Sequence, residues 1–411
     1  MNIGYIVHKE NELKNKVAII DACKEQEGLT YQELDRLTSN MAGHLMELGV
    51  KPGDIVMVML SNCIELQISY FSCFKAGAIM QPLNYFITDK DIYFASSQCK
   101  PKIFITSEAL WMDKVRGLKD KMPWISDFYC VGESVPADTK AFGELLGYCG
   151  EKQFPVISDQ DFGQLFFVFS DSKTKFHQRG VFLTHHVMEW HSYPYTLMGL
   201  NEKDIVAGIL HPYNALTRAV FHSGASYLLI SDFSGEKFIQ YCLNYGITFF
   251  GGTPNQFREI LEAAKKSNCY PKTLRACFSV GKLLDINLWK EFEERFNTRV
   301  YGGMGCKELG IFSVEPPNNR SKYGSMGKIV PYMEYKIDET DKKKNTGFLS
   351  VKSHSLITHY WIDGRIKKVE EEKGWFHTGF EVSVDDEGYF YPTGKVMDTS
   401  ISGMKRYYDA K

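Results

Sequence analysis

The stretch Phe169–His185 reads FSDSKTKFHQRGVFLTH and lies between an apolar run of strand length and a segment with helical periodicity. A loop in this position binds phosphate when small residues let backbone N–H groups surround the anionic oxygens. Lys173, Lys175 and Arg179 make the loop cationic, but glycine occurs in it only at Gly180. The stretch therefore predicts an α/β fold. It leaves open whether side chains have rebuilt an anion site here or the segment is a solvated basic loop.

Strand, helix and strand follow one another at short spacing upstream of this loop. Thr30 and Glu33 have the spacing of a capping box, and the helical apolar stripe behind them ends at Gly49. The elements predicted next are a strand, a helix and a strand, over Ile55–Met59, Cys63–Lys75 and Ala78–Gln81. This order with short links is typical of a parallel sheet.

The same alternation continues through the middle of the chain. Strands are predicted over Phe166–Phe169, Ser226–Ile230, Ile247–Phe250, Arg275–Ser279 and Arg299–Tyr301. Helices are predicted over Glu236–Asn244, Pro254–Lys266, Ile286–Phe296 and Thr184–Tyr193, the last of them ending before Pro194. After about residue 320 short strands with Gly/Asp turns predict a small β-rich subdomain, with strands at Tyr335–Asp338, Gly347–Lys352, Trp375–His377 and Gly388–Pro392 and a solvated turn over Asp338–Asn345.

Composition narrows the class of protein. The chain has 411 residues with 44% hydrophobic and 14% aromatic content, enough for two or three packed subdomains. Its formal net charge of −2 excludes the basic footprint of a nucleic-acid-binding protein. Its 10 scattered cysteines favour reduced thiols over disulfides or a zinc site. No apolar run approaches the roughly 20 residues of a membrane span, and the first residues lack the apolar core of a signal peptide. We therefore expect a cytoplasmic protein without a nucleic-acid partner.

Short motifs follow one another along the chain in a fixed order. They are Leu29–Leu34 (LTYQEL), Gly49–Asp54 (GVKPGD), Gly180–His185 (GVFLTH), Gly324–Lys328 (GSMGK) and Gly374–Gly379 (GWFHTG). This set resembles L-T-Y-x-E-L, G-V-x-x-G-D, the end of S-G-T-T-G-x-P-K-G-V-x-L-T-H, G-S-x-G-K and G-W-x-x-T-G-D of the adenylate-forming superfamily. That superfamily includes acyl-CoA synthetases, peptide-synthetase adenylation domains and luciferases. The resemblance implies its large N-terminal domain, with two mixed or parallel sheet subdomains flanked by helices and a small β-rich subdomain.

The resemblance also implies where the domains end. Residues 1–397 correspond to the large domain, and the β-rich subdomain occupies about 320–397 of it. Asp398 stands at the hinge position of the G-R-x-x-D motif. Residues 398–411 are therefore expected to be the hinge and a truncated start of the C-terminal lid domain, whose lysine contacts the acyl adenylate in the family. The rest of that lid domain is expected to be absent.

Members of the superfamily bind ATP and Mg²⁺, and the resemblance assigns residues to both. Glu308 takes the position of the catalytic, Mg²⁺-binding glutamate of Y-G-x-T-E, Met304 that of the adenine-stacking tyrosine, and Lys307 that of the phosphate-contacting threonine. Lys395 replaces the arginine of G-R-x-x-D, which keeps the charge but loses the bidentate fork. The candidate nucleotide-binding residues of the loop are Ser172, Thr174, Lys175 and Arg179.

Several of these positions have lost the chemistry that a nucleotide requires. Lys173 and Phe176 stand at the two glycine positions of the loop, and Phe380 replaces the aspartate that bonds both ribose hydroxyls. Unpaired hydroxyls cost roughly 1–3 kcal/mol each, and Glu381 could substitute only if the chain shifted by one residue. Four altered contacts at about 1 kcal/mol each predict a nearly thousandfold loss of nucleotide affinity.

The acyl pocket is implied to lie near the segment that resembles P-L-x-H. Asn214 stands at its histidine position, so His211 and Asn214 are candidate catalytic residues, against the alternative that a histidine without a paired acid is structural. The candidate pocket residues are Tyr213, Gly251, Gly252, Thr253, Gly302 and Gly303. Glycine at these positions leaves room for a substrate or allows close backbone packing.

Three functions remain open from the sequence. The altered nucleotide contacts favour a degenerate family member that keeps a pocket for an acyl or aryl carboxylate, an acyl thioester or a carrier protein without forming acyl adenylates. Such a protein would be a non-catalytic binder, or an enzyme of ATP-independent acyl-group chemistry. The alternative is an active ATP- and Mg²⁺-dependent carboxylate-activating enzyme, an acyl-CoA or acyl-AMP ligase.

Overall fold

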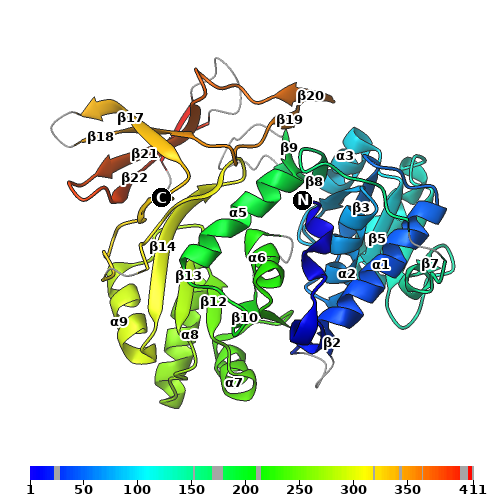
Figure 1. Cartoon of the computed structure of the whole chain (residues 1–411), viewed down its shortest axis with the longest axis horizontal. Coiled ribbons are helices and arrows are strands. Elements are labelled where there is room, and N and C mark those ends of the chain that lie inside the picture. The colour runs from blue at the N-terminus through cyan, green and yellow to red at the C-terminus, as the bar shows by residue number, and fades with distance from the viewer. Residues whose placement is uncertain are drawn as a thin grey trace.

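Two large β-sheets, a small third sheet and the helices between them build the protein (Figure 1). The computed structural model describes residues 1–22, 28–150, 153–168, 179–209, 214–317, 320–341, 345–362, 364–398 and 406–409. It confirms the predicted α/β class with two mixed sheets and a small β-rich part. None of the helices in these residues is both long and apolar enough to cross a membrane.

The first large sheet has nine strands in the described residues, in the order β16-β15-β14-β13-β12-β10-β11-β1-β2. Their bounds are Lys328–Ile329, Gly310–Val314, Arg299–Cys306, Ala276–Ser279, Phe249–Gly252, Ile205–Gly208, Ser226–Leu229, Val17–Asp21 and Gly28–Thr30. The strands from β14 to β1 are parallel, and β15, β16 and β2 add antiparallel edges. The parallel centre agrees with the strand–helix alternation of the sequence.

The second large sheet has the described order β20-β19-β9-β8-β4-β3-β5-β6-β7. Its strands are Arg365–Lys368, His359–Ile362, Arg179–Thr184, Phe162–Val168, Ile79–Pro82, Ile55–Met59, Ile103–Ser107, Asp127–Val131 and Lys140–Ala141. Strands β8 to β7 are parallel, whereas β8 with β9, β9 with β19 and β19 with β20 are antiparallel. Residues 359–368 therefore extend this sheet, although they lie within the stretch predicted as the β-rich subdomain.

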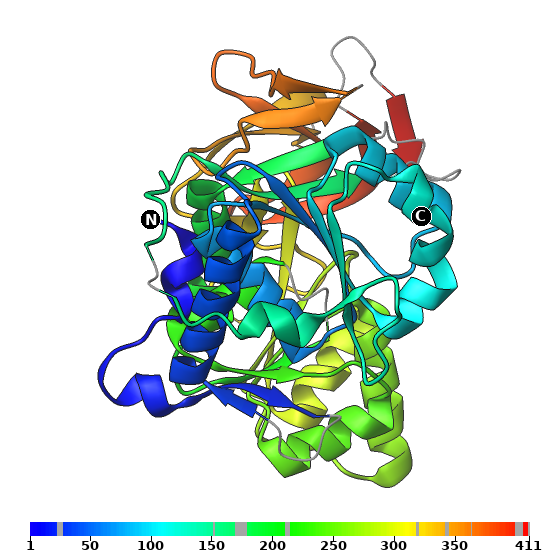
Figure 2. The ribbon, with the colours of Figure 1, turned by 90° about the vertical axis from the view of Figure 1, so that its right-hand side faces the viewer.

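The third sheet is antiparallel, with the described order β17-β18-β21-β22-β23. Its strands are Glu334–Asp341, Thr346–Lys352, Phe376–Val384, Phe390–Asp398 and Arg406–Asp409. It lies across one end of the two large sheets, and a quarter turn of the molecule shows the same arrangement (Figure 2). The predicted turn over 338–345 is wrong in its first part, because β17 continues to Asp341 and pairs there with Thr346.

Helices cover the large sheets and fill the space between them. The α-helices are α1 Tyr31–Glu47, α2 Ile64–Lys75, α3 Asp89–Cys99, α4 Glu108–Leu110, α5 His185–Leu197, α6 Ala215–Ser223, α7 Gly235–Tyr245, α8 Pro254–Ser267 and α9 Ile286–Phe296. Shorter turns are the 3₁₀ segments η1 Ile3–Val7, η2 Asn11–Asn15, η4 Arg116–Lys121 and η5 Phe142–Leu146, and the π-helical η3 Trp111–Val115. The predicted capping box is confirmed: the Thr30 hydroxyl accepts from the Glu33 N–H at 3.2 Å, and the Glu33 carboxylate accepts from the Thr30 N–H at 2.8 Å.

Helix α5 does not end before Pro194, so that prediction is wrong. The helix passes through the proline and continues to Leu197. Proline has no N–H and therefore leaves the carbonyl of Trp190, four residues earlier, without its helical partner. The hydroxyl of Tyr332 donates to this carbonyl at 3.1 Å. A tertiary contact thus compensates for the bond that the proline removes.

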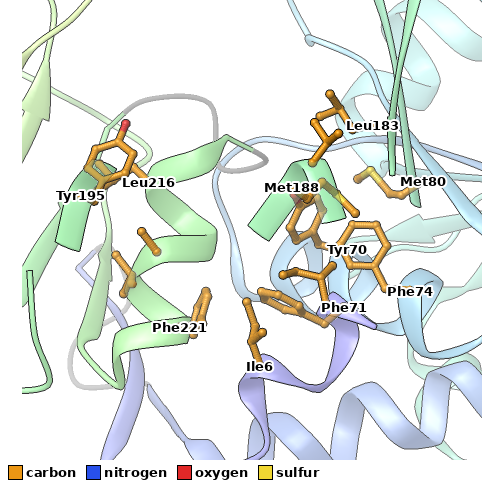
Figure 3. Close-up of a cluster of buried hydrophobic side chains, with 14 of the residues drawn as sticks. Ile6, Tyr70, Phe71, Phe74, Met80, Leu183, Met188, Tyr195, Leu216 and Phe221 are labelled. Atoms are coloured by element: carbon orange, nitrogen blue, oxygen red, sulfur yellow. The ribbon is translucent and has the colours of Figure 1, made fainter. Parts of the chain in front are cut away.

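A cluster of buried hydrophobic side chains, several of them aromatic, packs between α2, α6 and the N-terminal turn η1 (Figure 3). Tyr70, Phe71 and Phe74 come from α2, Ile6 from η1 and Phe221 from α6, and all are buried. The Phe71 and Phe221 rings meet edge to face at 5.1 Å, and the Tyr70 and Phe74 rings at 4.6 Å. This packing fixes α2 against α6, and the Phe74 ring also meets the His185 ring at 5.6 Å, which holds the start of α5 against α2.

Candidate active site

Glu308 lies in the turn between β14 and β15, where the first and second large sheets meet. Its carboxylate oxygen Oε1 accepts a hydrogen bond from Nη2 of Arg179 at 2.8 Å and one from the Tyr360 hydroxyl at 3.2 Å. Arg179 begins β9 and Tyr360 lies on the neighbouring strand β19. The structure therefore brings together two predicted site residues, Arg179 and Glu308, and adds Tyr360.

The Arg179–Glu308 pair is largely removed from solvent. The side chains of Arg179 and Glu308 are 11% and 7% exposed, and the guanidinium lies 5.7 Å from the centre of the Tyr360 ring. Burial, followed by the neighbouring Glu308 carboxylate, raises the pKa of the Tyr360 hydroxyl, so this group stays protonated and donates. The same two causes raise the pKa of the Cys306 thiol. Glu308 is thus a buried, oriented carboxylate with one cation already beside it.

The chemistry of this carboxylate fits Mg²⁺ only together with a phosphate ligand. In the residues that the structure describes, no group of three or more histidines, cysteines, aspartates or glutamates could hold a metal. Mg²⁺ in nucleotide sites is commonly bound by one or two carboxylates, water and substrate phosphates. Glu308 fits that pattern as the single carboxylate. A bound Mg²⁺ would have to share this carboxylate with the Arg179 guanidinium.

Met304 and Lys307 flank this position in different ways. Met304 is 5% exposed in strand β14, its side chain belongs to the hydrophobic core, and its N–H donates to the Ser313 hydroxyl at 3.1 Å. Lys307 is exposed, and its ammonium lies 5.7 Å from the centre of the Phe166 ring. Their predicted contacts with adenine and phosphate stay predictions.

The position of the ribose-binding aspartate offers no acceptor. Phe380 lies on β21 with its ring 6.0 Å from that of Phe312. The next residue, Glu381, is 5% exposed, and its carboxylate accepts from the Thr393 hydroxyl at 2.7 Å. Glu381 is therefore held by β22 and does not replace the missing carboxylate. The residues at this point do not fit a ribose held as in the family.

The predicted pocket glycines lie at the carboxyl end of β12 and in the middle of β14, and neighbouring side chains pack closely on Gly252, Gly302 and Gly303. An added Cβ would lie 2.2 Å from the Phe250 ring at Gly252, 2.9 Å from Trp289 at Gly302 and 3.0 Å from Phe278 at Gly303. Close packing therefore accounts for glycine at these three positions. Gly251 is buried on β12, and the Thr253 N–H donates to the Gln256 side chain at the start of α8. Their role as pocket residues stays a prediction.

Asn214 has a structural task in α6. Its side chain accepts from the Thr217 N–H at 3.1 Å and so caps the helix. The predicted site residues His211, Tyr213, Ser172, Thr174 and Lys175 lie outside the described residues. Lys395 and the predicted hinge residue Asp398 lie on β22, where their backbones pair with Asp409 and Arg406 of β23.

Sequence reasoning missed Tyr360 as part of this site. Tyr360 lies in the segment His359–Ile362 (HYWI). This segment has no pattern of polar residues that would indicate a site, and it resembles none of the motifs. Only the pairing of β19 with β9, Tyr360 opposite Val181, carries its hydroxyl to Glu308. No local signal in the chain could have identified it.

The fold and the position of Glu308 define the class of protein. Residues 7–361 match the family model described as AMP-binding enzyme, and the chain therefore belongs to that family. It is 24% identical over 418 residues to an uncharacterized acyl–CoA ligase of Bacillus subtilis (strain 168), covering 98% of this chain and 78% of that protein. It is 22% identical over 383 residues to the crotonobetaine/carnitine–CoA ligase of Salmonella typhimurium, covering 88% and 73%.

Solved structures show the same fold. An anthranilate CoA ligase in complex with anthranoyl-AMP superposes with a TM-score of 0.83 at 18% identity, covering 100% of this chain and 80% of that one. A Mycobacterium tuberculosis fatty acyl CoA synthetase superposes with a TM-score of 0.84 at 18% identity, covering 98% and 80%. The predicted resemblance to adenylate-forming enzymes is thereby confirmed.

Proposed function

We propose that this protein activates an acyl or aryl carboxylate with ATP, as a member of the acyl-CoA ligase type with weak nucleotide binding. The observation that supports the proposal is the Glu308 carboxylate, which is buried and oriented by Arg179 and Tyr360 at the junction of β9, β15 and β19. The similar proteins are named as CoA ligases of carboxylates, crotonobetaine or carnitine in one case and anthranilate in the other. This supports the same class of substrate here.

The residues at this junction have complementary tasks in the proposed reaction. Glu308 would hold Mg²⁺, which when bound neutralises phosphate charge. Arg179 supplies a guanidinium suited to a phosphate oxygen, because its planar fork can donate two hydrogen bonds. Tyr360 donates to the Glu308 oxygen and keeps the carboxylate in one orientation. Arg179 and Tyr360 come from the paired strands β9 and β19, and Glu308 comes from the turn between β14 and β15, so the fold itself holds their spacing.

A second candidate function is carboxylate binding without adenylation, either as a binder or with ATP-independent acyl-group chemistry. The observation that favours it is the pair of neighbours on β21, where Phe380 packs near Phe312 and Glu381 is engaged by Thr393. A ribose placed as in the family would lose its acceptor there, at roughly 1–3 kcal/mol for each unpaired hydroxyl.

ATP–pyrophosphate exchange over a panel of acyl and aryl carboxylates separates these functions. Exchange that needs Mg²⁺ and is lost in Glu308→Gln supports the ligase. Absence of exchange, with thermal stabilisation by one of the same acids, supports the second candidate. Neither exchange nor stabilisation by any acid would reject both. Formation of a CoA thioester by the active acids then tests the second half-reaction.

Replacing Phe380 by aspartate is expected to tighten the binding of AMP about thirtyfold. The new carboxylate offers an acceptor to the two ribose hydroxyls, and regained hydrogen bonds are worth about 1 kcal/mol each. Titration calorimetry with AMP measures the change. Phe380→Leu is the matched control, since it removes the ring without adding an acceptor. An equal gain in Phe380→Leu, or a weaker AMP complex in folded Phe380→Asp, would contradict the ribose assignment.

A further inference from the structure

A cavity of about 330 Å³ lies between α5, α6 and the N-terminal turn η1. Figure 1 shows α5 and α6 beside the N-terminal segment. The volume is at the lower end of the range for small-molecule pockets, roughly 300–1,000 Å³. Nothing in the mechanism above uses this cavity.

Arg218 of α6 lines the cavity and is an unusual buried cation. Its side chain is 2% exposed, and its bonds go to neutral acceptors: Nε donates to the Met188 carbonyl at 3.2 Å, and Nη1 to the Tyr70 hydroxyl at 2.7 Å and to Gln164 at 3.4 Å. Among the residues that the structure describes, Arg218 forms no ion pair with a carboxylate, and the three bonds from Nε and Nη1 are the hydrogen bonds that its guanidinium makes. A buried charge without a counter-charge is costly, so an anionic partner would be strongly favoured here.

The other lining residues indicate what kind of molecule could carry this anionic group. The rings of Trp190 and Tyr193 form part of the wall, with centroids 5.5 Å apart, and Ala219 adds apolar surface. The Ser192 hydroxyl, also in the wall, donates to the Met188 carbonyl at 2.9 Å, so its free lone pair can accept from a ligand. Glu189 lines the cavity as well, so its carboxylate opposes any anion in the cavity and a doubly charged one most. The wall therefore suits a monoanion with a flat or branched apolar body.

The cavity lies on a different side of α5 from the Glu308 junction. His191 abuts Gly310 of β15, and the Tyr195 ring meets Phe278 of β13 at 5.8 Å. Glu189, Tyr193 and Ser192 instead line the cavity. A ligand in the cavity would thus contact the opposite surface of the helix that follows β9, the strand that carries Arg179.

We propose that this cavity is a second ligand site, which binds a small aromatic or branched-chain carboxylic acid with its carboxylate on Arg218. The inference is independent of the proposed function, because it uses none of the residues of the Glu308 junction. Bound acid would supply the counter-charge that Arg218 lacks within the described part of the chain.

Titration calorimetry of the full chain with benzoate and with its neutral isostere benzamide tests the proposal. We expect benzoate to bind at least tenfold more tightly than benzamide. Arg218→Met keeps the unbranched apolar stem of the side chain and removes the guanidinium, and should weaken benzoate binding at least tenfold without changing that of benzamide. Ala219→Leu fills the cavity beside an intact Arg218 and should weaken both.

The binding results with benzoate and benzamide can be judged independently of the ATP–pyrophosphate exchange assay. Equal affinity for benzoate and benzamide, or no benzoate binding at millimolar concentration, overturns the proposal. Unchanged benzoate binding in Arg218→Met and in Ala219→Leu also overturns it, because the acid would then occupy another pocket. If Arg218→Met fails to fold, Ala219→Leu and the comparison of the two ligands still decide. A failed exchange assay leaves these results as they stand.

Discussion

Glu308→Gln is expected to lower ATP–pyrophosphate exchange at least a hundredfold and the free energy of unfolding by about 3 kcal/mol. Loss of one preorganised electrostatic contact in an active site typically costs 10²–10³ in rate, which is why the exchange effect should be large. The stability effect follows from burial. Glutamine leaves the Arg179 guanidinium, 11% exposed, without the charge that it faces at 2.8 Å.

A double replacement separates the two effects. Arg179→Met with Glu308→Leu removes both charges and should recover most of the stability lost in Glu308→Gln, because apolar pairs of similar volume often replace buried ion pairs without loss. Exchange should stay absent in this double variant. Urea unfolding and the exchange assay report the two quantities independently. Full exchange in Glu308→Gln would remove the carboxylate from the mechanism.

Between pH 7.5 and pH 4.5 the protein is expected to lose about 5 kcal/mol of stability through two histidines of α5. Burial lowers the pKa of His185 to about 4, and burial together with the Arg218 charge lowers the pKa of His191 to about 3. In the unfolded chain both titrate near 6.5. The unfolded state therefore binds more protons below pH 6.5, so stability is complete above that pH and falls steadily below it. Each histidine contributes roughly 2–3 kcal/mol by pH 4.5.

Two neutral replacements test this assignment while keeping the hydrogen bonds. His185 accepts from the Ile3 N–H at 3.2 Å through Nδ1, which His185→Asn can imitate. The Nε2 of His191 lies 3.0 Å from the Ser355 carbonyl, and a donor there can be supplied by His191→Gln. Urea unfolding at steps from pH 7.5 to 4.5 should give a much shallower loss in the double variant. An unchanged slope would assign the acid sensitivity to other groups.

Local patterns alone predict a large part of this fold. Strand β3 and helix α9 have the bounds that periodicity and flanking turn residues indicate, Ile55–Met59 and Ile286–Phe296. The capping box at Thr30 is equally local, since its atoms come from four consecutive residues. Where neighbouring residues in sequence decide the outcome, the sequence is sufficient.

Elements that depend on distant partners were not predictable in the same way. Pro194 is a reliable stop signal in isolation, but Tyr332, far along the chain, satisfies the carbonyl that the proline frees. Strand β9 carries no independent signal of its own, because its residues resemble the end of a phosphate loop, and only pairing with β8 and β19 makes them a strand. In both cases tertiary contacts override a correct local preference.

In the candidate site, too, local motifs predict some residues, whereas the contacts between them depend on the tertiary structure. Motif position alone singles out Glu308 and Arg179. Their ion pair and the hydrogen bond from Tyr360 arise only where strands β9 and β19 meet the turn between β14 and β15. The loss of an acceptor at Phe380 is also predictable from the motif. That Glu381 cannot compensate is visible only in the structure, because Thr393 on another strand holds its carboxylate.

The path of the chain through the sheets has a consequence for cooperativity. The chain leaves the third sheet after β18, adds β19 and β20 to the second sheet, and returns to the third at β21. Detaching the small sheet would therefore pull β19 away from β9, the strand that carries Arg179. The two sheets should melt as one calorimetric unit, and a ligand seated at Glu308 should slow amide exchange in both.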